Sequence, residues 1–348
     1  MPTAHDPILS GLDLPALQKY FETHIPETRG PLTARLIQGG RSNLTYRVSD
    51  GTGRWVVRRP PLGFLTPSAH NMEREYRVMA ALQGGAVAVP RTRVYCADES
   101  VIGAPFTVVE FVDGRVLRTQ QDVAGLGPGQ AERCIEGQIA QLAELHDVDY
   151  RAVGLGGFGR PEGYLRRQVD RWRSQWHLVA TRELPGLLRL HHALEAEIPT
   201  ESTAAIVHGD FRVDNTIIDP EDARVVRAVL DWEMSTIGDP LADVGLLLAY
   251  RDPAIEGLLH RPASSSPAFP NQDALAEQYA RASGRDLAGL PFHVALAFFK
   301  IAVIAEGIRQ RHLNGHTVGS GFEDVGRAVP ALVRAGLTTL GLDPSPDR

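Results

Sequence analysis

A short segment between residues 208 and 231 contains the residue types that phosphoryl transfer requires. It reads His208-Gly-Asp-Phe-Arg-Val-Asp-Asn215 and is followed, after an apolar stretch, by Asp231-Trp-Glu. Phosphoryl transfer depends on positioning and charge neutralisation more than on covalent help from the protein. One carboxylate must orient a hydroxyl and accept its proton, and we assign this role to Asp210. Because Mg²⁺ prefers hard oxygen ligands, the amide of Asn215 and the carboxylate of Asp231 are the predicted metal ligands.

The spacing of these residues favours catalysis over a simpler interpretation. Asp210 and Asn215 have four residues between them, which is the separation of the catalytic Asp and the metal-binding Asn in protein kinases. Asp231 ends an apolar strand expected at residues 225–230, where that pattern places a second metal-binding carboxylate. The alternative is a loop whose Asp and Asn side chains only form turns. The preceding His208 and Gly209 and the following Asp-bearing strand favour the catalytic interpretation.

Five sequence blocks in order resemble the aminoglycoside phosphotransferase and choline kinase superfamily. They are VVRRPP, PSAHNMEREYRVMAAL, GLGGFGRPEGYLRRQVDRW, HGDFRVDNTII and LDWEMSTIGDPLADVG. The similarity is strongest to the kinase-like domains found fused to, or beside, acyl-CoA dehydrogenases, and it extends over about residues 32–311. It implies a bilobal α+β fold of the protein-kinase type, ATP and Mg²⁺ as cofactors, and a small hydroxylated molecule as the phosphoryl acceptor.

The resemblance also indicates where a nucleotide should bind in the N-terminal part. The segment Gly39-Gly-Arg-Ser-Asn-Leu-Thr45 lies between two expected strands, and its Ser42, its Asn43 and its N–H groups could contact phosphate oxygens. An ordinary hairpin turn would have the same composition. Glu110 to Val112 ends the last strand of this part and resembles the hinge whose backbone receives adenine. Val57 and Ile217 are expected as apolar walls.

A basic residue that binds phosphate is expected on the strand at residues 55–59. The two lysines of the chain, Lys19 and Lys300, lie elsewhere, so an arginine must take this role. Arginine binds phosphate oxygens through a planar fork and stays charged. Adjacent side chains on a strand face opposite ways, so either Arg58 or Arg59 can point to the nucleotide, but not both. The family pattern favours Arg58.

The expected partner of Arg58 is a glutamate on the helix predicted at residues 69–82. Glu73 and Glu75 project about 200° apart on a helix, so only one of them can face the arginine. Glu75, in Arg-Glu-Tyr-Arg-Val-Met, matches the helix glutamate of the family. The alternative is that both are solvated charges on the helix surface.

The elements that must position these residues fall into two parts. A leading helix beginning at Asp13 and the strand-like segments define a β-rich N-terminal lobe at residues 1–112, and the helical segments define a larger C-terminal lobe at residues 113–348. The predicted strands of the first part are residues 32–38, 44–48, 55–59, 91–96 and 105–112, around one helix at 69–82. The predicted helices of the second part are residues 130–146, 164–182, 241–249, 273–282, 292–311 and 324–336, with strands at 216–218 and 225–230.

The phosphoryl acceptor should bind in the C-terminal lobe, near residues 164–176 and 298–311. Contacts or surface roles are equally open for Lys300, Glu306, Arg309 and Arg311. Their mixed charges do not indicate a polycationic aminoglycoside. Asp239 and Asp243 are expected to cap a helix and anchor the chain, and His208 to support the loop by hydrogen bonding.

Several functions are consistent with this pattern. The dehydrogenase-associated branch implies a hydroxyacyl-CoA or a hydroxy acid as acceptor, and a functional link to an acyl-CoA dehydrogenase. An antibiotic phosphotransferase acting on an aminoglycoside or a macrolide is one alternative. A nucleotide-binding regulatory module without turnover is another, and a structural partner of acyl-CoA enzymes is a third.

Composition excludes some classes of partner. The net charge of −6 gives no reason to expect nucleic acid, which attracts basic surfaces. Two cysteines are too few for a disulfide framework, and the N-terminus lacks the features of a signal peptide. The longest apolar segment, at residues 290–305, is interrupted by His293 and Lys300, so no membrane span is expected. We therefore predict a soluble cytoplasmic protein.

Overall fold

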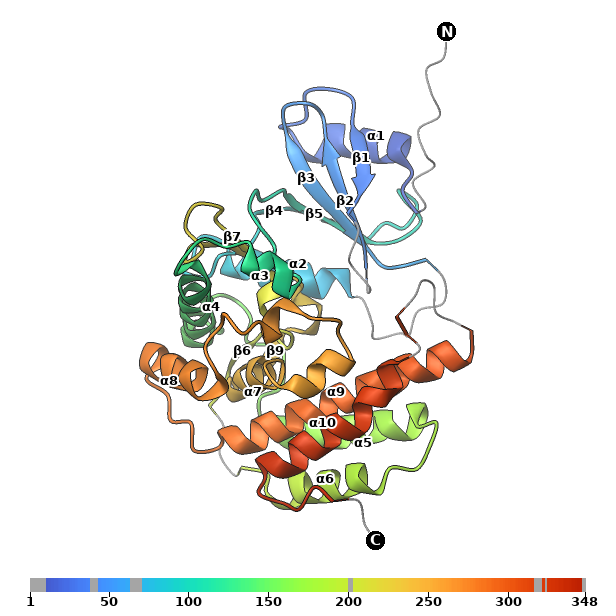
Figure 1. The fold of residues 1–348 in the computed structure, drawn as a ribbon. Coiled ribbons are helices and arrows are strands. Elements are labelled where there is room, and N and C mark those ends of the chain that lie inside the picture. Colours follow the sequence, from blue (N-terminus) through green and yellow to red (C-terminus); the bar gives the residue numbers. More distant parts are fainter. Residues whose placement is uncertain are drawn as a thin grey trace. The chain divides into compact units, whose positions relative to one another are not determined.

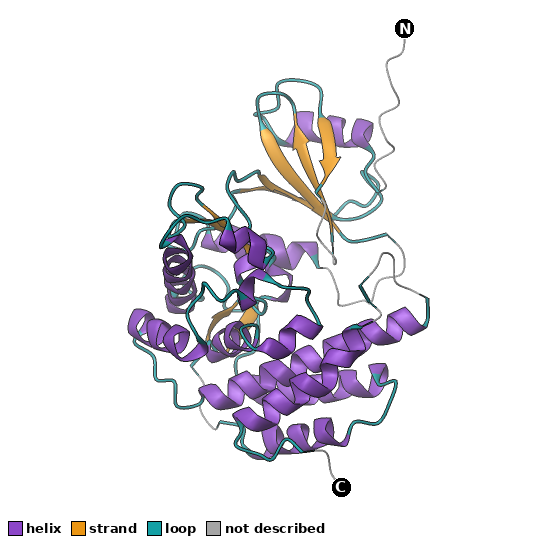
Figure 2. Cartoon of the chain, in the orientation of Figure 1, coloured by secondary structure: helices purple, strands orange, loops and turns teal. Residues whose placement is uncertain are grey.

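The computed structural model describes residues 11–37, 43–62, 71–199, 203–315, 321–322 and 324–345. Figure 1 and Figure 2 show a strand-rich part and a helix-rich part of the chain. The chain divides into two compact units, of which the first comprises Met1–Asp113 and Ala228–Glu233. The second comprises Gly114–Arg227 and Met234–Arg348. Asp231 therefore belongs to the first unit, although the loop at residues 208–215, which precedes it in the sequence, belongs to the second.

The first unit is built on a five-stranded antiparallel sheet with the order β1-β2-β3-β5-β4. Its strands are β1 (Thr33–Leu36), β2 (Leu44–Ser49), β3 (Arg54–Arg59), β4 (Thr92–Cys96) and β5 (Phe106–Glu110), and its helices are α1 (Leu14–His24) and α2 (Met72–Leu82). Each strand lies within one of the five predicted segments or extends it by one residue. Asp13 caps α1 by accepting a hydrogen bond of 2.9 Å from Ala16 N–H.

The hydrophobic core of this unit lies between α1 and one face of the sheet. Leu17 and Phe21 of α1 are fully buried in one cluster with side chains from β2, β3 and β5. On β3 the cluster includes Trp55 and Val57. Since strand side chains alternate between faces, Arg58 belongs to the face opposite α1. This alternation decides which groups can face a ligand.

The second unit is mainly helical. Its helices are α3 (Gln120–Ala124), α4 (Gln130–Asp147), α5 (Tyr164–Val179), α6 (Pro185–Ala196), α7 (Leu241–Ala249), α8 (Gln272–Ser283), α9 (Leu290–Leu313) and α10 (Val325–Thr339). Two small sheets pair β6 (Ala205–Val207) with β9 (Thr236–Gly238) and β7 (Thr216–Ile218) with β8 (Val226–Val229). The sequence predicts α7 and β7 with the observed ends, whereas α6, β6 and β9 were not predicted.

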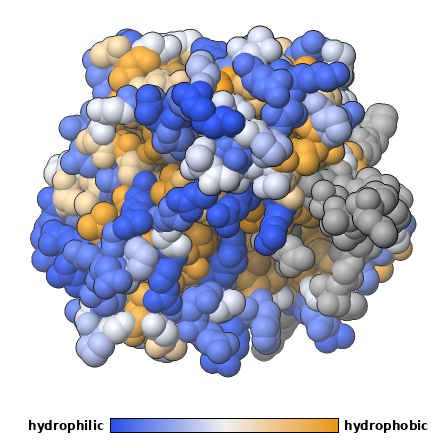
Figure 3. All heavy atoms as spheres, turned by 90° about the horizontal axis from the view of Figure 1, so that it is seen from above, coloured by the Kyte–Doolittle hydropathy of each residue, from blue (hydrophilic) through white to orange (hydrophobic). Residues whose placement is uncertain are grey.

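Helix α9 is the core helix of the second unit. Its length and composition would allow it to cross a membrane, but 78% of its most apolar 18-residue window is buried inside the protein. It packs against α5, α6, α7 and α10, and Figure 1 shows α10 running alongside it. Burial against other helices accounts for its apolar sequence. On the face shown in Figure 3, hydrophilic and hydrophobic residues are interspersed, as is usual for protein surfaces.

Candidate active site

The loop that carries Asp210 connects β6 to a 3₁₀ turn at Val213–Asn215 and then to β7. His208 at its start is fully buried, and its Nδ1 accepts the N–H of Asp210 at 3.2 Å. Gly209 between them has φ +83°, a conformation that favours glycine. A Cβ on Gly209 would lie 2.7 Å from the carbonyl oxygen of Met234. Glycine is therefore required at position 209 by both backbone conformation and space.

We expect Gly209→Ala to lower the free energy of unfolding by about 2 kcal/mol, since the side chain adds left-handed strain and a clash with Met234. Phosphoryl-transfer activity should fall as well, because the strain is next to Asp210. Urea denaturation and turnover measure the two effects. Gly157→Ala is the matched control, since its Cβ would have no neighbour within 4 Å, and it should change stability by less than about 0.5 kcal/mol. A Gly209→Ala protein as stable and active as the wild type would contradict this account.

A buried carboxylate of α7 holds the start of the loop. Asp243 accepts the N–H groups of His208 and Gly209, each at 2.7 Å, and contacts Nε2 of His146 at 3.2 Å. Burial opposes the charge of Asp243, but its hydrogen bonds and the nearby histidines outweigh burial and lower its pKa. The expected anchoring role of Asp243 is what the structure shows. Asp239 likewise accepts Leu241 N–H at 2.9 Å, at the start of α7.

The lowered pKa of Asp243 predicts a pH dependence of stability. Its contribution should be fully present above the unfolded-state pKa of about 3.9 and should disappear as the pH falls through the lower folded-state pKa. We expect Asp243→Asn to be less stable than the wild type by about 2–4 kcal/mol near pH 6, because a charge-assisted hydrogen bond contributes about 1.5–3 kcal/mol. The difference should shrink below about pH 4. Urea unfolding of both proteins between pH 3 and 7 measures it, and a pH-independent difference would refute the assignment.

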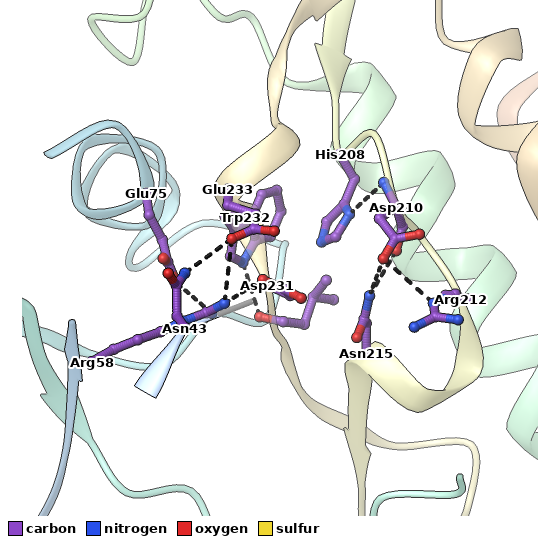
Figure 4. Close-up of polar contacts among 11 residues, drawn as sticks. Asn43, Arg58, Glu75, His208, Asp210, Arg212, Asn215, Asp231, Trp232 and Glu233 are labelled. Carbon is purple, nitrogen blue, oxygen red and sulfur yellow. Dashed lines mark hydrogen bonds and ion pairs between the residues drawn. The ribbon is translucent and has the colours of Figure 1, made fainter. Parts of the chain in front are cut away.

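Polar groups surround the carboxylate of Asp210 (Figure 4). Nδ2 of Asn215 donates to Oδ2 and to the backbone oxygen of Asp210, at 3.0 and 2.9 Å. Nε of Arg212 lies 3.4 Å from Oδ2, and the Tyr250 hydroxyl lies 3.4 Å from Oδ1. The guanidinium of Arg212 also stacks over the Tyr250 ring, 4.9 Å from its centroid. Asp210 is thus fixed in direction and paired with one cation. Its neighbours Arg212 and Tyr250 were not assigned roles from the sequence.

The first unit contains the expected arginine–glutamate pair. Nη1 of Arg58 lies 2.7 Å from Oε1 of Glu75, and Nη2 lies 2.5 Å from Oδ1 of Asp231. Figure 4 shows Arg58 between these carboxylates. Burial disfavours the charge of Arg58, but Glu75 and Asp231 outweigh it and raise its pKa. Arg59 lies on the other face, where it donates to the carbonyl oxygens of Gly11 and Ile102. The structure thus selects Arg58 as the arginine that meets Glu75.

Asp231 has an unusual backbone conformation. Its φ is +66°, in a region that non-glycine residues rarely occupy and that often marks a functional position. The next residue, Trp232, is fully buried, and its indole N–H donates to Val229 O at 2.9 Å. This anchor holds the turn that presents the carboxylate of Asp231. The ion pair with Arg58 and the strained backbone together hold the Asp231 carboxylate in one direction.

Ser42 and Asn43 are the two residues of the glycine-rich segment that were predicted to contact phosphate. Ser42 lies outside the described residues. Asn43 is buried, and its Nδ2 donates to Oε2 of Glu233 at 2.9 Å. Glu233 also lies 3.9 Å from Arg58. No role was assigned to Glu233 from the sequence. Its position two residues after Asp231 was the one signal that could have indicated a place near Arg58.

In the predicted hinge segment, residues 110–112, two of the three backbone N–H groups are hydrogen-bonded to neighbouring backbone oxygens. The N–H groups of Glu110 and Phe111 donate to Arg91 O at 2.8 Å and to Arg54 O at 3.1 Å. The Glu110 carboxylate pairs with Arg93. The N–H of Val112 donates to no backbone oxygen among the described residues, so it is the group that could meet a base.

The expectation that Val57 lines the nucleotide site is wrong. It is fully buried in the core on the α1 side of the sheet, whereas Arg58, the next residue, is on the opposite face. Val56 shares the face of Arg58, because residues two apart on a strand point the same way. The error arose from choosing an apolar residue without knowing which face α1 covers.

The predicted acceptor region has three different kinds of contact. Nζ of Lys300 donates to Gly209 O at 2.7 Å, so it contacts the loop that carries Asp210. The buried Glu306 carboxylate accepts hydrogen bonds from Thr181 and Arg182, and Arg309 also donates to Thr181. These two α9 residues therefore tie the helix to the segment after α5. Arg311 is exposed.

The predicted metal ligands lie in different units, Asn215 in the second and Asp231 in the first. Among the described residues, no group of three or more His, Cys, Asp or Glu side chains could hold a metal ion. The two side chains still suit Mg²⁺ by type. The Asn215 amide nitrogen is turned to Asp210, which leaves its oxygen for another partner, and Asp231 provides a partly exposed carboxylate.

Comparison with known proteins defines the class. A family model described as the phosphotransferase enzyme family matches residues 33–293. The structure of a Ralstonia eutropha protein, provisionally described as an aminoglycoside phosphotransferase, is 33% identical and covers 94% of this chain and 98% of its own, with a TM-score of 0.81. Aminoglycoside 2′-phosphotransferase-IIIa, solved with GDP, has a TM-score of 0.64, covers 94% of this chain and 100% of its own, and shares the fold at 15% identity. This chain belongs to the phosphotransferase enzyme family and has its kinase-like fold.

A curated relative places the chain more closely. Acyl-CoA dehydrogenase family member 11 from Gallus gallus is 36% identical over 338 residues. The match covers 93% of this chain and 43% of that relative, so the chain spans less than half of the relative's length. The resemblance to the dehydrogenase-associated kinase-like branch is thereby confirmed.

Proposed function

We propose that this chain transfers the terminal phosphoryl group of ATP to the hydroxyl of a small molecule. The acceptor oxygen forms a bond to the γ-phosphorus while the bond from that phosphorus to the β,γ-bridging oxygen breaks, and ADP leaves. The hydroxyl proton passes to Asp210. The observation that carries this proposal is the fixed carboxylate of Asp210, held by Asn215 on a loop whose N–H groups Asp243 accepts.

The remaining roles follow from chemistry and charge. Arg58 binds phosphate oxygens, and Glu75 orients Arg58. Asn215 and Asp231 would hold Mg²⁺, which would neutralise charge on the triphosphate. The partly exposed carboxylate of Asp231 suits this role by type. Backbone groups of Glu110 and Val112 would receive the base, and the family resemblance assigns Ser42 and Asn43 to the phosphates.

A hydroxyacyl-CoA or a related hydroxy acid is the proposed acceptor class. Its support is the relatedness to a protein named as an acyl-CoA dehydrogenase family member. A functional link to an acyl-CoA dehydrogenase is part of the same proposal.

A screen for ATP-dependent phosphorylation tests the proposal. Hydroxyacyl-CoAs, free hydroxy acids, choline-like alcohols and aminoglycosides are incubated with Mg²⁺-ATP, and phosphorylated products are detected by mass spectrometry. We expect product from the hydroxyacyl compounds and none when an Asp210 variant replaces the wild type. If only the aminoglycosides are phosphorylated, the acceptor is an aminoglycoside and the proposed hydroxyacyl class is wrong. Metal-dependent ATP binding without product from any alcohol would instead support a regulatory module.

A further inference from the structure

Lys300 is one of only two lysines among the 36 basic residues of the chain. It lies on α9, in a stretch where Phe298, Phe299 and Ile301 are buried. Removing an ammonium group from water is costly, so a lysine at this position needs compensating contacts. The roles proposed for Asp210, Asn215 and Asp231 do not account for a lysine at this position.

The ammonium group of Lys300 contacts the catalytic loop directly. Its Nζ donates to the carbonyl oxygen of Gly209 at 2.7 Å and lies 5.8 Å from the centroid of the Trp172 ring. Burial lowers the pKa of Lys300, while the charges of Asp210 and Asp243 oppose that effect. The lysine is therefore a half-buried donor whose charge interacts with Asp210 of the loop and with Asp243 of α7.

This contact completes the fixation of one peptide group. The Gly209–Asp210 peptide has its carbonyl oxygen bound by Lys300 and its N–H bound by Nδ1 of His208. The preceding peptide has its N–H bound by Asp243. Glycine has unusual backbone freedom, so without these bonds the peptide before Asp210 could rotate. Its rotation would redirect the catalytic carboxylate.

We propose that Lys300 is a positioning residue, which fixes the Gly209–Asp210 peptide and through it the direction of the Asp210 carboxylate. Its effect on turnover rests on the proposed function. Its effect on the loop does not.

Lys300→Met tests the proposal, because it keeps an unbranched apolar stem as far as Cε and removes the donor. We expect kcat to fall about 10- to 100-fold with little change in KM for ATP, since misplacement of about 1 Å can cost 10²-fold. Hydrogen–deuterium exchange should be faster in residues 206–211 and unchanged in the parts of α9 away from Lys300. In Lys300→Gln the donor is one bond closer to the backbone. This variant should also show a lower kcat and faster exchange in residues 206–211, and it replaces Lys300→Met if that variant does not fold.

Gln310→Met is the matched control. Gln310 is on the same helix and also donates to a backbone carbonyl, that of Leu178, at 2.9 Å. It should leave both kcat and exchange in residues 206–211 unchanged. The inference is overturned if the folded Lys300 variants exchange like the wild type in this segment, or if their kcat is within twofold of the wild type. If the wild type transfers phosphate to no alcohol, the proposed function fails, and the exchange comparison still decides the role of Lys300.

Discussion

Asp210→Asn should reduce turnover by about 10²–10⁴-fold while leaving the protein folded, because an amide cannot accept the proton of the acceptor hydroxyl. The change is nearly isosteric. The amide oxygen of the variant can keep the Oδ2 contacts with Asn215 and Arg212, and its NH₂ group can donate to the Tyr250 hydroxyl oxygen, so the surrounding loop should persist. KM for ATP should change little, since Asp210 acts on the acceptor. Initial rates at saturating ATP and acceptor, with melting temperatures of both proteins, measure the effect.

The control for this prediction is a carboxylate outside the site. Asp222→Asn removes an exposed charge that pairs with Arg133 on the surface, and it should keep wild-type turnover. Retention of ATP-dependent phosphorylation by Asp210→Asn would remove Asp210 from its role. It would also remove the observation on which the proposed function depends.

Arg58→Met should damage both stability and nucleotide use. It leaves Glu75, which is only 3% exposed, without its cation, and breaking a buried pair on one side costs about 3–5 kcal/mol. It also removes the proposed phosphate ligand, so KM for ATP should rise by at least about tenfold. Urea denaturation and initial rates at varied ATP measure the two effects.

A double substitution separates these two consequences. Arg58→Met combined with Glu75→Leu replaces the ion pair by apolar side chains, which is often neutral or stabilising. We expect most of the lost stability to return while KM for ATP stays high. Recovery of both stability and ATP use would show that Arg58 is only structural. If the double variant regains no stability, Arg58 stabilises the fold through contacts other than its ion pair with Glu75.

The sequence by itself determined the kind of fold and the loop on which the candidate catalytic residues lie. Alternating apolar residues in β2 and β3 and helical spacing in α7 are local signals, so their types and approximate ends could be predicted. The separation of Asp210 and Asn215 is also local, because the residues lie on one loop and the 3₁₀ turn that follows it. β6 and β9 have three residues each, too few for a periodic signal, and α6 has none of the helix-start signals used elsewhere except Pro185.

Tertiary structure alone decided the contacts between distant residues. Period-two alternation shows that Arg58 and Arg59 face opposite ways, but only the packing of α1 against the sheet shows which face is the core. The same packing explains the error at Val57. Glu233 meets Asn43 across 190 residues of sequence, and Asp243 and Lys300 reach the Gly209 loop from helices that follow it in the chain. Sequence spacing carries information about residues on one element, whereas these bonds depend on how separate elements pack together.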